Sequence, residues 1–234
     1  SNMFNSSHGL ITIPLLDTSN VTNMTSMFQY CRNLISIPQL DTSSVTNVSS
    51  MFYGCSSLTS IPQLNTSSVT RMINTFSGCH QLTTIPLLDT SNVTDMSNMF
   101  NSSHGLITIP LLDTSKVTNM SQMFYYNESL TSIPQLDTSS VTIMAEMFAG
   151  CGSLTTVPLL NTSNVTNIRE MFRGCSSLSN ESLNNILYMC AHSAVTTASN
   201  KTLKHLSLTS TQATTCQSLS NYQAFLDAGW TTVS

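Results

Sequence analysis

Aspartate recurs at one position of a repeated pattern, and stacked carboxylates are groups that could bind calcium. The aspartates at this position are Asp17, Asp41, Asp89, Asp113 and Asp137. In stacked units their charges would lie about 5 Å apart, and a Ca²⁺ ion between them would relieve the repulsion. The alternative is that each carboxylate accepts backbone amides within its own turn. Asn65 and Asn161 occupy the same position, and because a neutral side chain is accepted there, we expect turns rather than a metal site.

Cysteine occupies a second column of the pattern. Its members are Cys31, Cys55, Cys79, Cys151 and Cys175. Stacked Cβ vectors run parallel rather than toward one another, and Ser or Asn fills the column in other units, so we expect buried free thiols. Cys190 and Cys216 follow the repeats and could pair with each other.

The remaining candidates for chemistry are weaker. His80 and His104 fall at one position of neighbouring units and could share a metal, but Arg32 and Glu128 occupy that position elsewhere, which indicates a solvated turn. The sequence contains no nucleophile elbow, phosphate-binding loop, dinucleotide fingerprint or HExxH motif. We therefore expect no catalytic residue, no metal and no cofactor, and a protein that is not an enzyme.

All these side chains belong to a pattern that repeats every 24 residues, so the repeated unit determines where they lie. Phenylalanine marks it at Phe4, Phe28, Phe52, Phe76, Phe100, Phe124, Phe148 and Phe172. The prolines keep the same spacing at Pro14, Pro38, Pro62, Pro86, Pro110, Pro134 and Pro158. A period without insertions indicates one structural unit stacked on itself, with apolar residues in continuous columns.

The two halves of each unit have different patterns. In the first half, Leu58 and Ile61 belong to a short segment of strand-like composition, which Pro62 should end because proline has no amide hydrogen. In the second half, helical spacing relates Val45, Val48, Met51, Phe52 and Cys55. Thr46 could cap such a helix, and Gly54 would suit its left-handed end.

We therefore predict an α/β repeat solenoid. It would be a leucine-rich-repeat horseshoe or curved rod, with short parallel strands on one side and short helical or 3₁₀ segments on the other. Residues 1–178 would form about seven to eight units of 24 residues, the first of them truncated.

Residues 179–234 break the period and should form an α-rich C-terminal cap, which stacked repeats need to cover their last apolar face. A small separate binding domain is the alternative. The predicted elements are a helix beginning near Ser179, a last strand over residues 201–208, and a second helix that Ser220 caps and Gly229 ends.

The pattern CxxLxxIPxLDTSxVTxMxxMFxxC, over residues 1–178, resembles the BspA-like leucine-rich repeats of bacterial surface proteins. Departures are few: Asn65 and Asn161 replace the aspartate, Thr75 replaces a methionine, and Ser or Asn replaces some cysteines. The resemblance implies a right-handed horseshoe or gently curved solenoid with its strands on the concave side. It also implies adhesion to host matrix proteins or recognition at the cell surface.

Composition limits the partners. Charged residues are 8% of the 234 residues, against a typical quarter, and the net charge is −4. Without a basic patch we expect no nucleic acid, and without a long apolar run we expect no membrane insertion. Abundant Ser, Thr and Asn suit an extracellular or cell-surface location. The expected partner is a protein or glycoprotein, including host extracellular matrix, and the open apolar edge near Phe4 predicts fraying of the first unit or self-association.

The predicted ligand-binding residues lie on the strand side, which repeat proteins use for recognition. They are Thr12, Ser36, Ser60, Thr84, Thr108, Ser132 and Thr156, with Gln39, Gln63 and Gln135 beside them. These columns vary little, which suits a repetitive ligand bound by many weak contacts. We predict a non-enzymatic adhesion or recognition protein; the alternative is a structural spacer or stalk of a surface or phage-borne protein.

Overall fold

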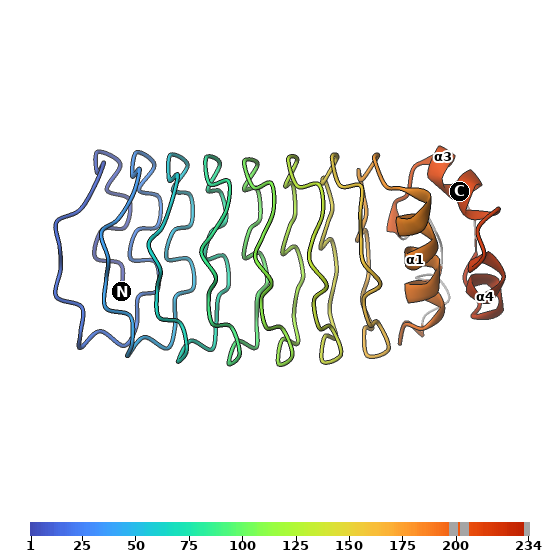
Figure 1. Ribbon diagram of the computed structural model, residues 1–234, viewed down its shortest axis with the longest axis horizontal. Coiled ribbons are helices and arrows are strands. Elements are labelled where there is room, and N and C mark those ends of the chain that lie inside the picture. Colours follow the sequence, from blue (N-terminus) through green and yellow to red (C-terminus); the bar gives the residue numbers. More distant parts are fainter. Residues whose placement is uncertain (197–200, 202–205, 232–234) are drawn as a thin grey trace.

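The protein is a repeat solenoid with a helical end. The computed structural model describes residues 1–196, 201 and 206–231. Figure 1 shows flattened coils stacked along the long axis, with helices α1, α3 and α4 at the C-terminal end. The solenoid agrees with the prediction. In this view, however, the row of coils is nearly straight rather than bent into a horseshoe.

Phenylalanine side chains form a continuous stack through the interior. Neighbouring rings, from the Phe4–Phe28 pair to the Phe148–Phe172 pair, have centroids 5.6–5.7 Å apart and interplanar angles of 1–14°. Columns of Leu, Ile, Val and Met are buried around this stack. Because one coil cannot cover its own apolar side chains, burial in each coil depends on its neighbours.

The half of each coil that we predicted to be helical consists of turns. Along it, successive backbone amides alternate between two kinds of partner. The amide of Ser26 donates across to the carbonyl of Ser49 in the next coil at 3.0 Å, whereas that of Met27 donates back to the carbonyl of Met24 at 3.2 Å. These amides are thus paired without a helix.

Two left-handed residues in each coil explain why the predicted helical or 3₁₀ segment does not form. Ser50 has a φ of 56° and Gly54 a φ of 72°, and the same two positions are left-handed in other coils. An α-helix requires consecutive right-handed residues, so it cannot pass through either position. Thr46 therefore caps no helix; its amide donates to the carbonyl of Thr22 in the preceding coil at 2.9 Å.

Isolated backbone bridges, rather than strands, join the coils, and most of them lie in the half of the unit that we predicted to be helical. Within the described residues, coils pair through single parallel bridges, such as Asn23 with Asn47, and no continuous strand forms. On the proline side, the amide of Thr59 donates to the carbonyl of Ile35 at 3.0 Å. Pro62 then lacks an amide hydrogen, which interrupts the ladder between coils.

Helix α1, Asn180–Ala191, lies against the last coils, where a helix was predicted. Ser179 is its N-cap and accepts a hydrogen bond from the Ser182 amide. The Ser182 hydroxyl accepts from the amide of Val157 at 2.9 Å and donates to the carbonyl of Thr155 at 2.9 Å. The helix therefore satisfies backbone groups at the end of the stack.

Two shorter helices belong to the same end of the chain. Helix α3, Ser210–Cys216, was not predicted, although Thr209 and Gln212 form a capping box at its start. Helix α4, Tyr222–Asp227, has Asn221 as its N-cap, so the predicted cap at Ser220 is wrong.

Residues 202–205 of the strand predicted over 201–208 lie outside the described residues, and residues 201 and 206–208 are not in a strand. No helix in the described part of the chain has the length and apolar character needed to cross a membrane.

Candidate binding face

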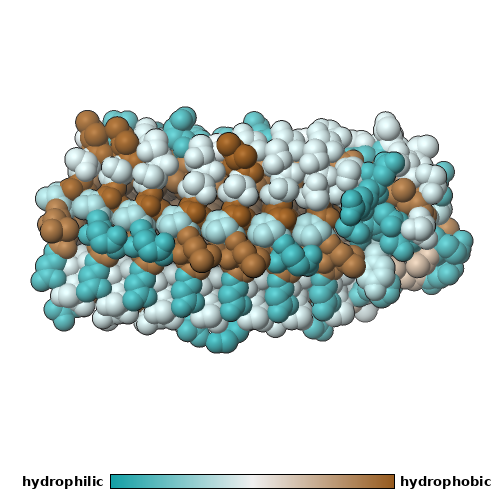
Figure 2. Space-filling view, in the orientation of Figure 1, coloured by the Kyte–Doolittle hydropathy of each residue, from teal (hydrophilic) through white to brown (hydrophobic). Residues whose placement is uncertain are grey.

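The predicted hydroxyl column lies on one long face, beside the prolines. Its exposed members are Thr12, Ser60, Thr84, Thr108 and Thr156, and its half-buried members are Ser36 and Ser132. We define the proline face as this column, the prolines, the residue after each proline and the residue before each hydroxyl. Figure 2 shows such columns as parallel rows along the molecule.

The three predicted glutamines have a structural role on this face. Side-chain amides of Gln39, Gln63 and Gln135 donate to backbone carbonyls of the next coil at 2.7, 2.6 and 2.9 Å. They do so directly after a proline, where the backbone has lost a donor. A partner that used these amide groups would have to compete with the coil-to-coil bonds.

Exposed aliphatic side chains lie on the same face, on both sides of the hydroxyl column. The residue after the proline is 77% exposed at Leu15 and 61% exposed at Leu87 and Leu111. Ile11 and Ile107, on the other side of the hydroxyl column, are 58% and 51% exposed. The sequence contains a signal for this exposure, because successive side chains of an extended segment point to opposite faces. Ile107 directly follows Leu106, which belongs to a buried column, and so points outward.

These aliphatic residues and hydroxyls form a mixed surface along the solenoid. Figure 2 shows exposed apolar side chains interspersed with polar ones along this side of the molecule. A shallow hollow of about 460 Å³ lies beside Ile11 and Ile35, with Asn33 and Thr59 also lining it. Contiguous exposed apolar groups with polar neighbours are typical of a surface that binds another molecule.

The aspartate column forms turns, as the alternative to calcium predicted. Asp41 accepts hydrogen bonds from the Ser43 hydroxyl at 2.7 Å and from the Ser43 amide at 3.0 Å. These bonds hold the pKa of the Asp41 carboxyl below its ordinary value. Asn65 makes the same two contacts with Ser67, which explains why Asn is accepted. Among the described residues, no three His, Cys, Asp or Glu side chains are grouped as a metal site would require.

Hydrogen bonding also explains the cysteine column. The Cys55 thiol donates to the carbonyl of Phe28 in the preceding coil at 3.0 Å. Ser103 and Asn127 make the equivalent bond with other phenylalanine carbonyls, at 2.6 and 2.8 Å. All seven cysteines are free and buried, so Cys190 and Cys216 are not bridged. Burial raises the pKa of Cys55 to about 12, which disfavours a reactive thiolate.

The histidine pair lies near the surface, where each coil passes from its turns to its proline side. The rings of His80 and His104 have centroids 4.9 Å apart. His104 Nδ1 lies 2.8 Å from the carbonyl of Tyr126, and so donates its proton there. Partial burial, and then the neighbouring His104, lower the pKa of His80. The pair is thus part of a polar edge, with no third ligand among the described residues.

Stacked coils, buried aliphatic columns and a terminal helix define a repeat protein of the leucine-rich type. The chain belongs to the family described as "Mycoplasma protein of unknown function, DUF285", which matches residues 1–108 and 107–207. The fold is similar to that of a leucine-rich repeat protein from T. pallidum (TpLRR), which is 23% identical with a TM-score of 0.59. That match covers 76% of this chain and 81% of the other.

A leucine-rich repeat protein from Bacteroides ovatus is 18% identical with a TM-score of 0.23, over 72% of this chain and 73% of the other. No curated protein matches the chain. At these identities, the T. pallidum structure supports the fold of this protein and leaves its function to be argued from the surface.

Proposed function

We propose that the protein is a non-enzymatic recognition or adhesion protein of the cell surface or extracellular space, and that it binds a protein or glycoprotein through the proline face. One observation carries this proposal: exposed leucines and isoleucines, interspersed with Gln and Thr, lie on either side of a column of hydroxyls. Membership of a leucine-rich-repeat-like family is consistent with protein binding.

The construction of this face favours a long ligand that runs along the solenoid axis. Stacked coils hold Leu87 and Leu111 at equivalent positions, one coil apart, and both are 61% exposed. Burying one such side chain contributes about 1.5–3 kcal/mol. Several of them, held by a rigid backbone, would bind an extended partner with little loss of side-chain entropy.

The second candidate is a spacer that holds another domain away from a surface. Residues 1–19 are identical to residues 97–115, and such a duplication suits an array in which length matters more than side-chain identity. A spacer needs no exposed leucines, however, and substituting them would leave its purpose intact. The two proposals therefore predict different effects of substituting the exposed leucines, and a binding assay can measure these effects.

The test is binding of the protein to immobilised fibronectin, fibrinogen and mucin, measured by surface plasmon resonance. The variant Leu87→Lys/Leu111→Lys places two charges on the proline face, at exposed positions. The matched control Ser44→Lys/Ser68→Lys places two charges at exposed turn positions, in a column where the chain already has Lys116.

We expect saturable binding that falls at least tenfold in the leucine variant and less than twofold in the control. Equal affinities for both variants would remove the proline face as the site. Absence of saturable binding to all three ligands would favour the spacer.

A further inference from the structure

At two places on the edge where each coil passes from its turns to its proline side, a tyrosine is followed by glycine at the same position of the next two coils, and we call each place a notch. The first notch consists of Tyr30, Gly54 and Gly78, and the second of Tyr126 with Gly150 and Gly174 at the same positions. A Cβ atom on Gly54 would lie 2.7 Å from Tyr30 Cδ1, and one on Gly150 would lie 3.0 Å from Tyr126 Cγ. Each tyrosine ring therefore rests on the glycine of the next coil.

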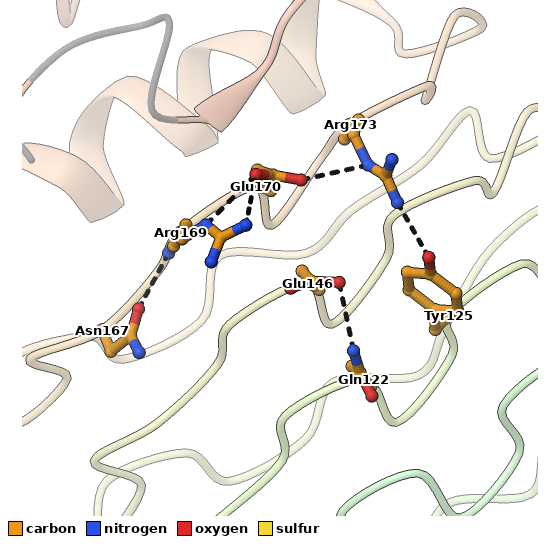
Figure 3. Close-up of polar contacts among 7 residues, drawn as sticks. All are labelled: Gln122, Tyr125, Glu146, Asn167, Arg169, Glu170 and Arg173. Carbon is orange, nitrogen blue, oxygen red and sulfur yellow. Dashed lines mark hydrogen bonds and ion pairs between the residues drawn. The ribbon is translucent and has the colours of Figure 1, made fainter.

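An arginine of the protein itself reaches over the second notch. Arg173 Nη2 donates to the Tyr125 hydroxyl at 2.9 Å, as Figure 3 shows. The guanidinium carbon lies 5.7 Å from the centroid of the Tyr125 ring and 6.0 Å from that of Tyr126, within the range of cation–π attraction. A planar group with hydrogen-bonding capacity thus packs on tyrosines at this edge.

The first notch lacks such an occupant. Ser77 stands at the position that corresponds to Arg173, and an open hollow of about 390 Å³ remains. Tyr30 and Tyr53, whose ring centroids are 5.1 Å apart in an edge-to-face arrangement, form its aromatic wall. Its polar lining comprises Ser56, His80, Asn101 and Ser102.

The two notches also differ in the charged residue at one equivalent position. Arg32 lines the hollow at the position that Glu128 occupies beside the second notch. Arg32 is exposed, and among the described residues the ion pairs of the chain join Arg169 and Arg173 to Glu170. The guanidinium of Arg32 is therefore available to bind an anion. Guanidinium groups bind carboxylates and phosphates especially well, because two parallel N–H donors match two oxygen atoms.

We propose that the first notch binds an acidic sugar, that is, a pyranose ring that bears a carboxylate. The apolar face of the sugar ring would contact the aromatic wall that Tyr30 and Tyr53 form, and the carboxylate would pair with Arg32. The sugar hydroxyls would form hydrogen bonds with polar groups of the lining. The hollow combines an aromatic surface with convergent polar groups, as small-molecule sites do. The site shares no residue with the proline face and does not depend on what that face binds.

Isothermal titration of the full chain with methyl β-glucuronide tests this proposal, with methyl β-glucoside as the ligand that lacks the carboxylate. Arg32→Glu introduces the charge found beside the second notch. The matched control is Arg71→Glu, the same change at an exposed arginine outside the hollow. Ser77→Arg, a second variant, introduces the side chain that covers the second notch.

We expect the glucuronide to bind at least tenfold more tightly than the glucoside. Arg32→Glu should lower its affinity at least tenfold and Arg71→Glu less than twofold, with unchanged circular dichroism, and Ser77→Arg should also abolish binding. Equal binding of both glycosides, or equal losses in both arginine variants, would overturn the proposal. An equally tight complex with a triglutamate peptide would show a general carboxylate site and would overturn the sugar assignment.

Discussion

The aspartate and cysteine columns of the solenoid are each defined by a hydrogen bond rather than by one residue type. Cys79 donates to the carbonyl of Phe52 at 3.2 Å, and Ser103 occupies the same position in the next coil with a bond of 2.6 Å. The sequence predicted buried free thiols, because Ser and Asn replace them. It could not show the acceptor, since the phenylalanine carbonyl lies in another coil.

The first prediction concerns this donor. We expect Cys79→Ala to lower the free energy of unfolding by about 1 kcal/mol more than Cys79→Ser, because both variants lose the sulfur but only serine keeps a donor. Urea denaturation followed by circular dichroism measures the difference. Equal stability of the two variants would show that the column selects small size alone.

The second prediction concerns the titration of the buried thiols. Burial raises the pKa of Cys55 and Cys151 from the ordinary value of 9.0 to about 12. Above pH 9 the unfolded chain therefore loses protons that the folded chain keeps. The free energy of unfolding should be unaffected by these thiols below about pH 9, and fall by about 1.4 kcal/mol per thiol and pH unit between about pH 9 and 12.

Urea titrations at about pH 8, 10 and 11 check this expectation. The double variant Cys55→Ser/Cys151→Ser lacks both thiols and should show a smaller loss of stability over this range, while tyrosines titrate equally in both proteins. Parallel pH profiles for the two proteins would contradict it.

At the scale of one coil, the helix prediction failed for a specific reason. Val45, Val48 and Met51 are spaced like one face of a helix, yet turns with hydrogen bonds from residue i to residue i−3 give the same spacing; the Met51 amide donates to the carbonyl of Val48 at 3.0 Å. Ser50 is left-handed, although serine rarely adopts that conformation. Sequence patterns therefore predicted which side chains are buried, but not the backbone between them.

The third prediction tests that backbone. Ser50 has a φ of 56°, so Ser50→Gly should be neutral or stabilising, because glycine adopts this conformation without strain. Ser50→Val should lower the free energy of unfolding by about 1–2 kcal/mol, since a branched Cβ is strained there. Denaturant unfolding compares the two variants. A valine variant as stable as the glycine variant would argue against the left-handed turn and for a helix.

For the whole molecule, the repeat predicted the solenoid and the alignment of the hydroxyl column, because periodic residues must stack if each coil is to bury its apolar side chains. The repeat did not predict which side chains of the proline face join neighbouring coils and which are exposed to a partner. The amide of Gln63 ties two coils together at 2.6 Å, whereas Leu87, at the equivalent position, is exposed. The difference depends on contacts between coils, which a pattern within one unit does not contain.

The last prediction removes one whole coil. Deleting residues 73–96 joins Met72 to Ser97 and leaves every column in register, because Met96 is the equivalent of Met72 in the next coil. The shortened protein should fold with the same circular dichroism per residue and a melting temperature lower by only a few degrees, since it loses one nearest-neighbour interface.

Deleting half as much, residues 73–84, would instead set polar turn residues of one coil against the phenylalanine column of the next. This second variant should lose cooperative unfolding, because the coils on its two sides can no longer stack. Thermal denaturation measures the melting temperature and the cooperativity of unfolding for both variants. If the two deletions were tolerated equally, the stability of the molecule would not come from side chains stacked one coil above another.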